Sequence, residues 1–169
     1  MERSLILFLN LVFVSFCSCQ TIQQTSIKCD CSDRKVQDSL IEEYLDKAEA
    51  LPDMYNNPLW LSYCDSVIAI CPDIAFAYQH KAVPYLKNGE YEKASTLIDK
   101  AVELNPERWT AYRGFCKCIF TKNYEGAIVD FQKAQQLLPN GYEMDHSYFF
   151  WQGVSYLELK NYSKAREKL

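Results

Sequence analysis

Cysteine is the residue of this chain whose side chain is most often reactive, and the sequence of 169 residues holds eight. Six lie after residue 19: Cys29, Cys31, Cys64, Cys71, Cys116 and Cys118. An even number of cysteines in an oxidising compartment suggests disulfide bonds, and only geometry decides which of them pair. A thiol enzyme needs a neighbour that activates the thiol, and none can be placed from the sequence. We therefore expect no catalytic residue of this kind.

The sequence motifs that could indicate a metal site or an acid–base pair are as weak as those for a reactive thiol. Cys29-x-Cys31 and Cys116-x-Cys118 could together offer four thiolates to zinc, but zinc motifs normally space their thiolates by two to four residues. Asp145-His146 has the residue types of a catalytic pair, yet adjacent side chains at a helix start do not face each other. We expect Asp145 to cap the helix or to face its dipole. The sequence predicts no metal, no cofactor and no enzyme.

An apolar segment at the N-terminus predicts export. It runs over residues 4–16 and is shorter than the ~20 residues that span a bilayer. Small residues follow it, so we expect a signal peptide over residues 1–19. Residues 16–19 resemble a bacterial lipoprotein box in which Cys19 would carry the lipid, and simple cleavage with secretion is the alternative. We expect a membrane-anchored lipoprotein of the bacterial cell envelope, with its body outside the cytoplasm.

The amino-acid composition limits the classes of protein to which this chain can belong. The formal net charge is -4 and 49% of residues are hydrophobic, which fits an ordinary globular domain with a real core. Because no basic stripe is present, we expect no nucleic-acid partner.

Small, aromatic and proline residues recur at a fixed distance. A spacing of 34 residues separates three matched pairs: Tyr44 and Tyr78, Ala48 and Ala82, and Pro72 and Pro106. A constant period of this length is typical of a stacked array of helical hairpins, in which each unit buries its apolar face against its neighbours. Such an array presents a groove, which favours binding over catalysis.

This pattern resembles the tetratricopeptide repeat family. The resemblance is strongest in residues 75–108, at Tyr78, Ala82, Tyr85, Gly89, Tyr91, Ala94, Ile98, Ala101 and Pro106. It implies an all-α fold, a right-handed solenoid of antiparallel helical hairpins with three to four repeats, the last incomplete. We divide the chain accordingly: signal peptide 1–19, tether 20–32, degenerate N-terminal repeat or cap 33–74, repeat 75–108, repeat with a long connector 109–145, and partial repeat 146–169.

Two residues depart from the family pattern. Trp60 stands where a small residue belongs, and Pro84 lies inside a first helix, where it removes a hydrogen bond. In this family the first helix of each hairpin lines the concave face. The resemblance therefore implies a peptide-binding groove formed by Phe76, Gln79, Val83, Arg113, Lys117, Phe120, Phe150 and Val154.

Arg113 and Lys117 are the charged members of this predicted groove. They lie four residues apart, so both project from one helix face and could hold a peptide carboxylate. The alternative is a solvated face that pairs with nearby Glu. We expect a non-enzymatic module that binds a protein or peptide partner in the groove, without a small-molecule cofactor. A structural subunit that docks end-on through its C-terminal helix, and a cysteine-based redox protein, are the alternatives.

Overall fold

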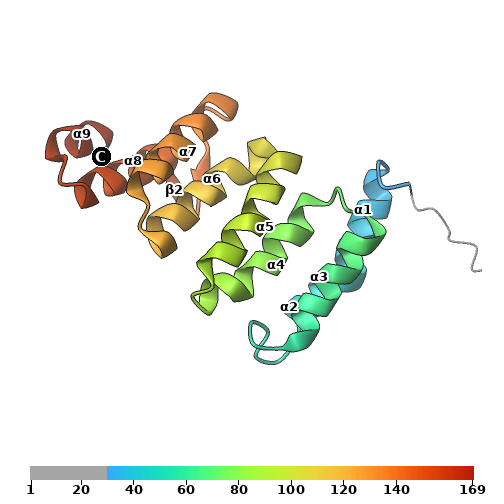
Figure 1. Cartoon of the computed structure of the whole chain (residues 1–169). Coiled ribbons are helices and arrows are strands. Elements are labelled where there is room, and N and C mark those ends of the chain that lie inside the picture. Colours follow the sequence, from blue (N-terminus) through green and yellow to red (C-terminus); the bar gives the residue numbers. More distant parts are fainter. Residues whose placement is uncertain (1–29) are drawn as a thin grey trace, which may run out of the picture.

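A computed structural model describes residues 30–169. The predicted signal peptide, the predicted lipidation site Cys19 and most of the predicted tether lie outside the described residues. Figure 1 shows the described helices stacked side by side in chain order, from the blue N-terminal end to the red C-terminal end. Each helix packs mainly on the helices before and after it in the sequence. The all-α solenoid of helical hairpins that the repeat predicts is confirmed.

The described chain forms four helical units. The first holds α1 (Arg34–Leu40), the π-helical turn η1 (Ile41–Leu45), α2 (Asp46–Glu49) and α3 (Pro58–Ile70). The later units are α4 (Ala75–Lys87) with α5 (Tyr91–Leu104), α6 (Pro106–Cys116) and its π-helical end η2 (Lys117–Thr121) with α7 (Tyr124–Leu137), and α8 (Tyr148–Glu158) with α9 (Tyr162–Lys168). Within residues 30–169, no helix is long and apolar enough to cross a membrane.

Local chemistry sets the helix ends. Asn57 accepts a hydrogen bond from the Leu59 amide and so caps α3, which begins at Pro58, a residue tolerated there because its missing N–H needs no helical partner. Gly89 ends the α4–α5 turn with a φ of 78°. The next amide, of Glu90, donates to the Tyr85 carbonyl at 2.8 Å, which closes the helix end in the way that a left-handed glycine permits.

Small residues bring the paired helices together. Ala82 on α4 and Ala94 and Ala101 on α5 are fully buried. Trp109 and Tyr112 from α6 pack on the same cluster. This cluster joins one repeat to the next, since alanines allow close approach and aromatic rings fill the remaining space.

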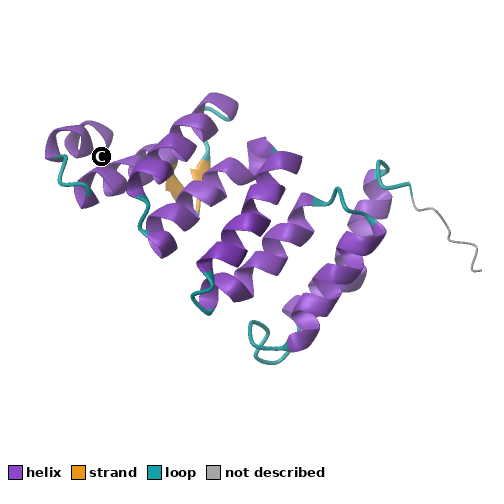
Figure 2. Ribbon diagram, in the orientation of Figure 1, coloured by secondary structure: helices purple, strands orange, loops and turns teal. Residues whose placement is uncertain are grey.

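The connector after α7 differs from the prediction. It contains a two-stranded antiparallel hairpin of β1 (Tyr142–Glu143) and β2 (His146–Ser147), which is orange in Figure 2. Met144 and Asp145 form its turn with φ values of 46° and 62°. Ser147 caps α8 by accepting from the Phe150 amide, so the expectation that Asp145 caps this helix is wrong.

One disulfide ties the start of the described chain to the first repeat. Cys31 is bonded to Cys71, which follows α3, across 40 residues of sequence. Because Cys31 is not a free thiolate, the four-thiolate zinc alternative is excluded. Cys64, Cys116 and Cys118 are buried thiols, and a buried cysteine of this kind packs as a small apolar residue.

Candidate functional site

A hollow lies on the side of the array that α4 and α6 form. Its volume is about 350 Å³, and we call it the central depression. The lining side chains come from several parts of the chain: Glu49 on α2, Tyr55 in the loop before α3, Trp60 on α3, Gln79, His80, Val83, Leu86 and Lys87 on α4, Tyr112, Phe115 and Phe120 on α6 and η2, and Met144 on the hairpin. Most of these side chains are aromatic or aliphatic.

One wall of the central depression holds Trp60, whose contacts there depend on Pro84 in α4. Pro84 has no N–H, so the carbonyl of His80 one turn earlier lacks its helical donor. The indole Nε1 of Trp60 donates to this carbonyl at 2.8 Å. The two rings of Trp60 and His80 also stack, with centroids 5.6 Å apart and planes 5° apart. Trp60 therefore supplies the hydrogen bond that Pro84 removes.

A polar chain runs behind the same wall. His80 is 6% exposed, and its Nε2 lies 2.7 Å from Glu49 Oε1 while its Nδ1 lies 3.0 Å from Gln79 Oε1. Burial lowers the pKa of His80, and the Glu49 carboxylate opposes this shift. The Glu49 carboxylate can only accept a hydrogen bond, so Nε2 of His80 donates to it, and Nδ1 faces the Gln79 oxygen. These contacts fix the orientation of Gln79 and His80 at the hollow.

The structure brings together three of the eight predicted groove residues. Gln79, Val83 and Phe120 line the central depression. Phe76 packs beneath it, with its ring centroid 4.0 Å from that of His80. The other two apolar members of the predicted groove lie elsewhere, half-buried against the core of the third and fourth units: Phe150 and Val154.

Arg113 and Lys117 are held by acidic partners. Arg113 donates from Nε and NH2 to the two Asp130 oxygens, at 3.0 Å and 2.7 Å, and from NH1 to Asp99 at 2.8 Å. Lys117 Nζ lies 2.7 Å from Asp130, which is 3% exposed. These pairs hold α6 against α5 and α7. The structure thus favours the ion-pairing alternative for both cations, with Asp in place of the expected Glu.

Most residues that line the central depression were not predicted from the sequence. Tyr55, Trp60, His80 and Met144 lie outside the helical positions that the family resemblance assigns to ligand contacts. Two signals pointed toward this region: the bulky residue Trp60 at a small-residue position, and the extra length of the connector that carries Met144. Neither signal identified which residues it would contact.

Comparison with known proteins agrees with this fold. Residues 77–108 match the family model of the tetratricopeptide repeat. The chain is 38% identical over 72 residues to serine/threonine-protein phosphatase T of Trypanosoma brucei brucei (strain 927/4 GUTat10.1), a match that covers 41% of this chain and spans 15% of the length of that protein.

Solved structures of MamA share the architecture. A MamA RS-1 ArsTM double mutant superposes with a TM-score of 0.60 at 20% identity, covering 81% of this chain and 73% of that chain. A MamA AMB-1 structure gives a TM-score of 0.56 at 19% identity, covering 84% and 73%. At these identities the likeness establishes a tetratricopeptide-like helical solenoid and nothing further.

Proposed function

We propose that this chain is a non-enzymatic protein-interaction module that binds an apolar anchor of a peptide or helix in the central depression. The single observation that supports this most is the apolar lining of the hollow, to which Tyr55, Val83, Tyr112, Phe115 and Phe120 contribute. Concave apolar sites with a few fixed polar groups are the usual binding sites of proteins, and buried aromatic anchors dominate binding energy. Gln79 and His80 supply the fixed polar groups.

The cysteines argue against the redox alternative. Burial raises the pKa of Cys64 and of Cys116 to about 12, and burial also raises the pKa of Cys118. Since the thiolate is the nucleophile, thiols of this kind react slowly at neutral pH.

A peptide selection followed by two matched variants tests this function. Random peptides displayed on phage are selected on the full chain, and the affinity of the enriched sequences is measured by fluorescence anisotropy. Val83→Glu places a charge in the hollow and is expected to weaken binding by roughly tenfold or more. Val129→Glu is the control, because Val129 is 62% exposed on α7 and lies outside the lining. Equal losses in both variants, or none, would refute the site.

We further propose that the protein works outside the cytoplasm, as a lipoprotein anchored at Cys19 or, alternatively, as a secreted chain. The Cys31–Cys71 disulfide supports this compartment, because disulfides persist mainly in oxidising environments. Intact mass of the protein from its native membrane fraction is the test. An acylated chain that begins at Cys19 is expected, a chain that begins at Gln20 would indicate secretion, and an unprocessed chain in the cytosol would contradict both.

A second candidate function is end-on assembly with another copy of the chain. Exposed apolar side chains gather on the last helical pair, at Phe149, Leu157, Tyr162 and Leu169. Sedimentation velocity over a range of protein concentrations tests this idea. Self-association that Tyr162→Glu abolishes and Val83→Glu leaves unchanged would favour it, whereas a concentration-independent monomer would exclude it.

A further inference from the structure

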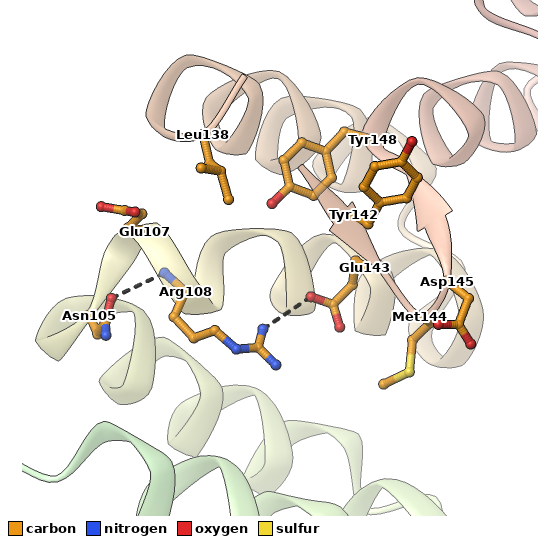
Figure 3. Close-up of a pocket in the computed structure, with 9 residues that line it drawn as sticks. All are labelled: Asn105, Glu107, Arg108, Leu138, Tyr142, Glu143, Met144, Asp145 and Tyr148. Carbon is orange, nitrogen blue, oxygen red and sulfur yellow. Dashed lines mark hydrogen bonds and ion pairs between the residues drawn. The ribbon is translucent and has the colours of Figure 1, made fainter. Parts of the chain in front are cut away.

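A second hollow lies beside the β1–β2 hairpin and is distinct from the central depression. It has a volume of about 690 Å³ and lies between the start of α6, the end of α7 and the hairpin. Figure 3 shows its lining residues, and we call it the hairpin pocket. Met144, at the turn of the hairpin, lies in the lining of both hollows. The hairpin pocket therefore exists because of the connector that interrupts the repeat pattern.

Glu143 is the charged group most deeply set in the hairpin pocket. Its side chain is 4% exposed, and Arg108 NH1 donates to its Oε2 at 3.2 Å. No described residue donates a hydrogen bond to the other oxygen, Oε1. Burial raises the pKa of Glu143, and the charge of Arg108 opposes this shift. One carboxylate oxygen thus keeps its acceptor capacity unused.

Arg108 neutralises Glu143 only in part. Its side chain is 55% exposed, and its guanidinium lies 4.3 Å from the centroid of the Trp109 ring. Figure 3 shows it reaching Glu143 from the α6 side of the hairpin pocket. A long exposed side chain of this kind can shift along the ring face without losing its contact, so a second cation can share the carboxylate.

Tyr148 gives a second and independent observation. The residue is 4% exposed, yet no described residue forms a hydrogen bond with its hydroxyl. Figure 3 shows this hydroxyl pointing into the hairpin pocket, on the side where Arg108 lies. Gly141 leaves room for the Tyr148 ring, because a Cβ at this position would overlap the hydroxyl and the ring edge. A hydroxyl that is held by a buried ring and bonded to no described residue is a ready hydrogen-bonding group for a ligand.

The charges of the hairpin pocket select the sign of that ligand. Its lining holds three carboxylates, Glu107, Glu143 and Asp145, and among the described lining residues Arg108 is the one cation. This leaves an excess of two negative charges (three minus one). An anionic group would be repelled, whereas a cationic group with several N–H donors can bond Glu143 Oε1 and the Tyr148 oxygen together.

We propose that the hairpin pocket binds the guanidinium or ammonium group of an Arg or Lys side chain on a protein partner. Glu143 accepts one N–H and Tyr148 accepts another. The exposed carboxylates Glu107 and Asp145 attract the cation as it approaches, which raises the rate of association more than the final affinity. This site does not require that the central depression binds a peptide.

An NMR titration of the full chain tests the proposal. The probe is N-acetyl-arginine methylamide, and the shape-matched control is N-acetyl-citrulline methylamide, which lacks the charge. We expect the arginine probe to shift the amide signals of Glu143 and Tyr148 at millimolar concentration, and the citrulline probe to bind roughly tenfold more weakly or worse. Equal binding of the two probes, or preferential binding of N-acetyl-glutamate methylamide, would overturn the proposal.

Two variants locate the binding site. Tyr148→Phe removes a hydroxyl that no described residue bonds, so the fold is expected to persist while the probe binds several-fold more weakly. Glu143→Gln keeps the shape of the side chain and is expected to abolish the difference between arginine and citrulline. Tyr162→Phe, at a residue of α9 that is 66% exposed, is the matched control and should leave binding of the probe unchanged. Unchanged binding in Tyr148→Phe and Glu143→Gln would place the cation elsewhere and refute the site.

These experiments test the proposal for the central depression and the proposal for the hairpin pocket independently. Val83→Glu is expected to weaken the selected peptides and to leave the arginine titration unchanged. A loss of arginine binding in Val83→Glu would contradict the separation of the two hollows. Normal arginine binding without any peptide binding would refute the proposed function of the central depression and support the proposed cation site in the hairpin pocket.

Discussion

Replacing Trp60 by Phe keeps an aromatic ring beside His80 and removes one hydrogen-bond donor. The His80 carbonyl then loses the indole N–H at 2.8 Å and has no helical donor, because residue 84 is proline. A buried carbonyl left without a partner costs about 1–3 kcal/mol of unfolding free energy. The smaller ring adds a further loss from reduced burial, on the order of 1 kcal/mol.

The second variant, Pro84→Ala, separates these two losses. The alanine that it introduces has an N–H that can donate to the His80 carbonyl within α4, so this carbonyl no longer depends on Trp60. In the Pro84→Ala background, Trp60→Phe should therefore cost only the packing part. We expect a coupling free energy of about 1–3 kcal/mol between the two positions, well above the ~0.5 kcal/mol within which independent sites add.

Urea unfolding of the four proteins in this cycle is the assay, with the midpoint and slope fitted for each. Trp109→Phe is the matched control, since Trp109 is a buried indole that bonds no described residue through its nitrogen. The reasoning is refuted if Trp60→Phe costs no more than Trp109→Phe, or if the coupling free energy is zero within error.

Other contacts in the fold make four further predictions. Cys31→Ser with Cys71→Ser opens a link across 40 residues and should lower the free energy of unfolding by about 4 kcal/mol in the loop-entropy model; reductant should lower the urea midpoint of the wild type and leave that of the double variant unchanged. Gly89→Ala forces a φ of 78° on a side chain and should cost about 1–2 kcal/mol, whereas Lys122→Gly, at a φ of 56°, should stabilise the fold in thermal melts. Because burial lowers the pKa of His80, the unfolded chain binds a proton first as the pH falls below the ordinary value of 6.5, so the urea midpoint should fall there, and this component should be absent in His80→Gln. Asp130→Asn should cost more than about 1 kcal/mol, since Asp130 is buried beneath Arg113 and Lys117, while Asp65→Asn at an exposed pair should change the unfolding free energy little.

The helices could be predicted from the sequence because their signals are local and repeated. Asn57 and Pro58 define the start of α3, and Gly89 marks the end of α4, each through a few neighbouring backbone groups. The buried alanines recur at the repeat period, so each unit repeats the evidence of the last. The expected division between repeats at residues 108 and 109 follows the repeat period, whereas α6 itself begins at Pro106, a position that suits proline.

The site was harder to predict because its contacts cross between units. The cations Arg113 and Lys117 share a helix face, as expected, but Asp130, which pairs with both, lies on α7. Helical spacing tells which side chains project together and says nothing of the neighbour that they meet. A buried aspartate one helix later converts two predicted ligand contacts into a structural ion pair.

The central depression and the hairpin pocket both lie where the chain departs from the repeat pattern. The way in which repeats pack explains this relation. A residue that fits the repeat packs against an equivalent residue in the next unit, so its side chain is used by the core. Trp60 and the β1–β2 hairpin have no equivalent in the other units of the described chain, and their side chains fill space that the repeat leaves open. Met144 connects the two departures by lining both hollows. Specificity in this chain is therefore expected to depend on residues that the repeat pattern does not predict, and mutations at Trp60 and Glu143 should alter partner choice more than mutations at Ala82 or Ala101, which should alter stability.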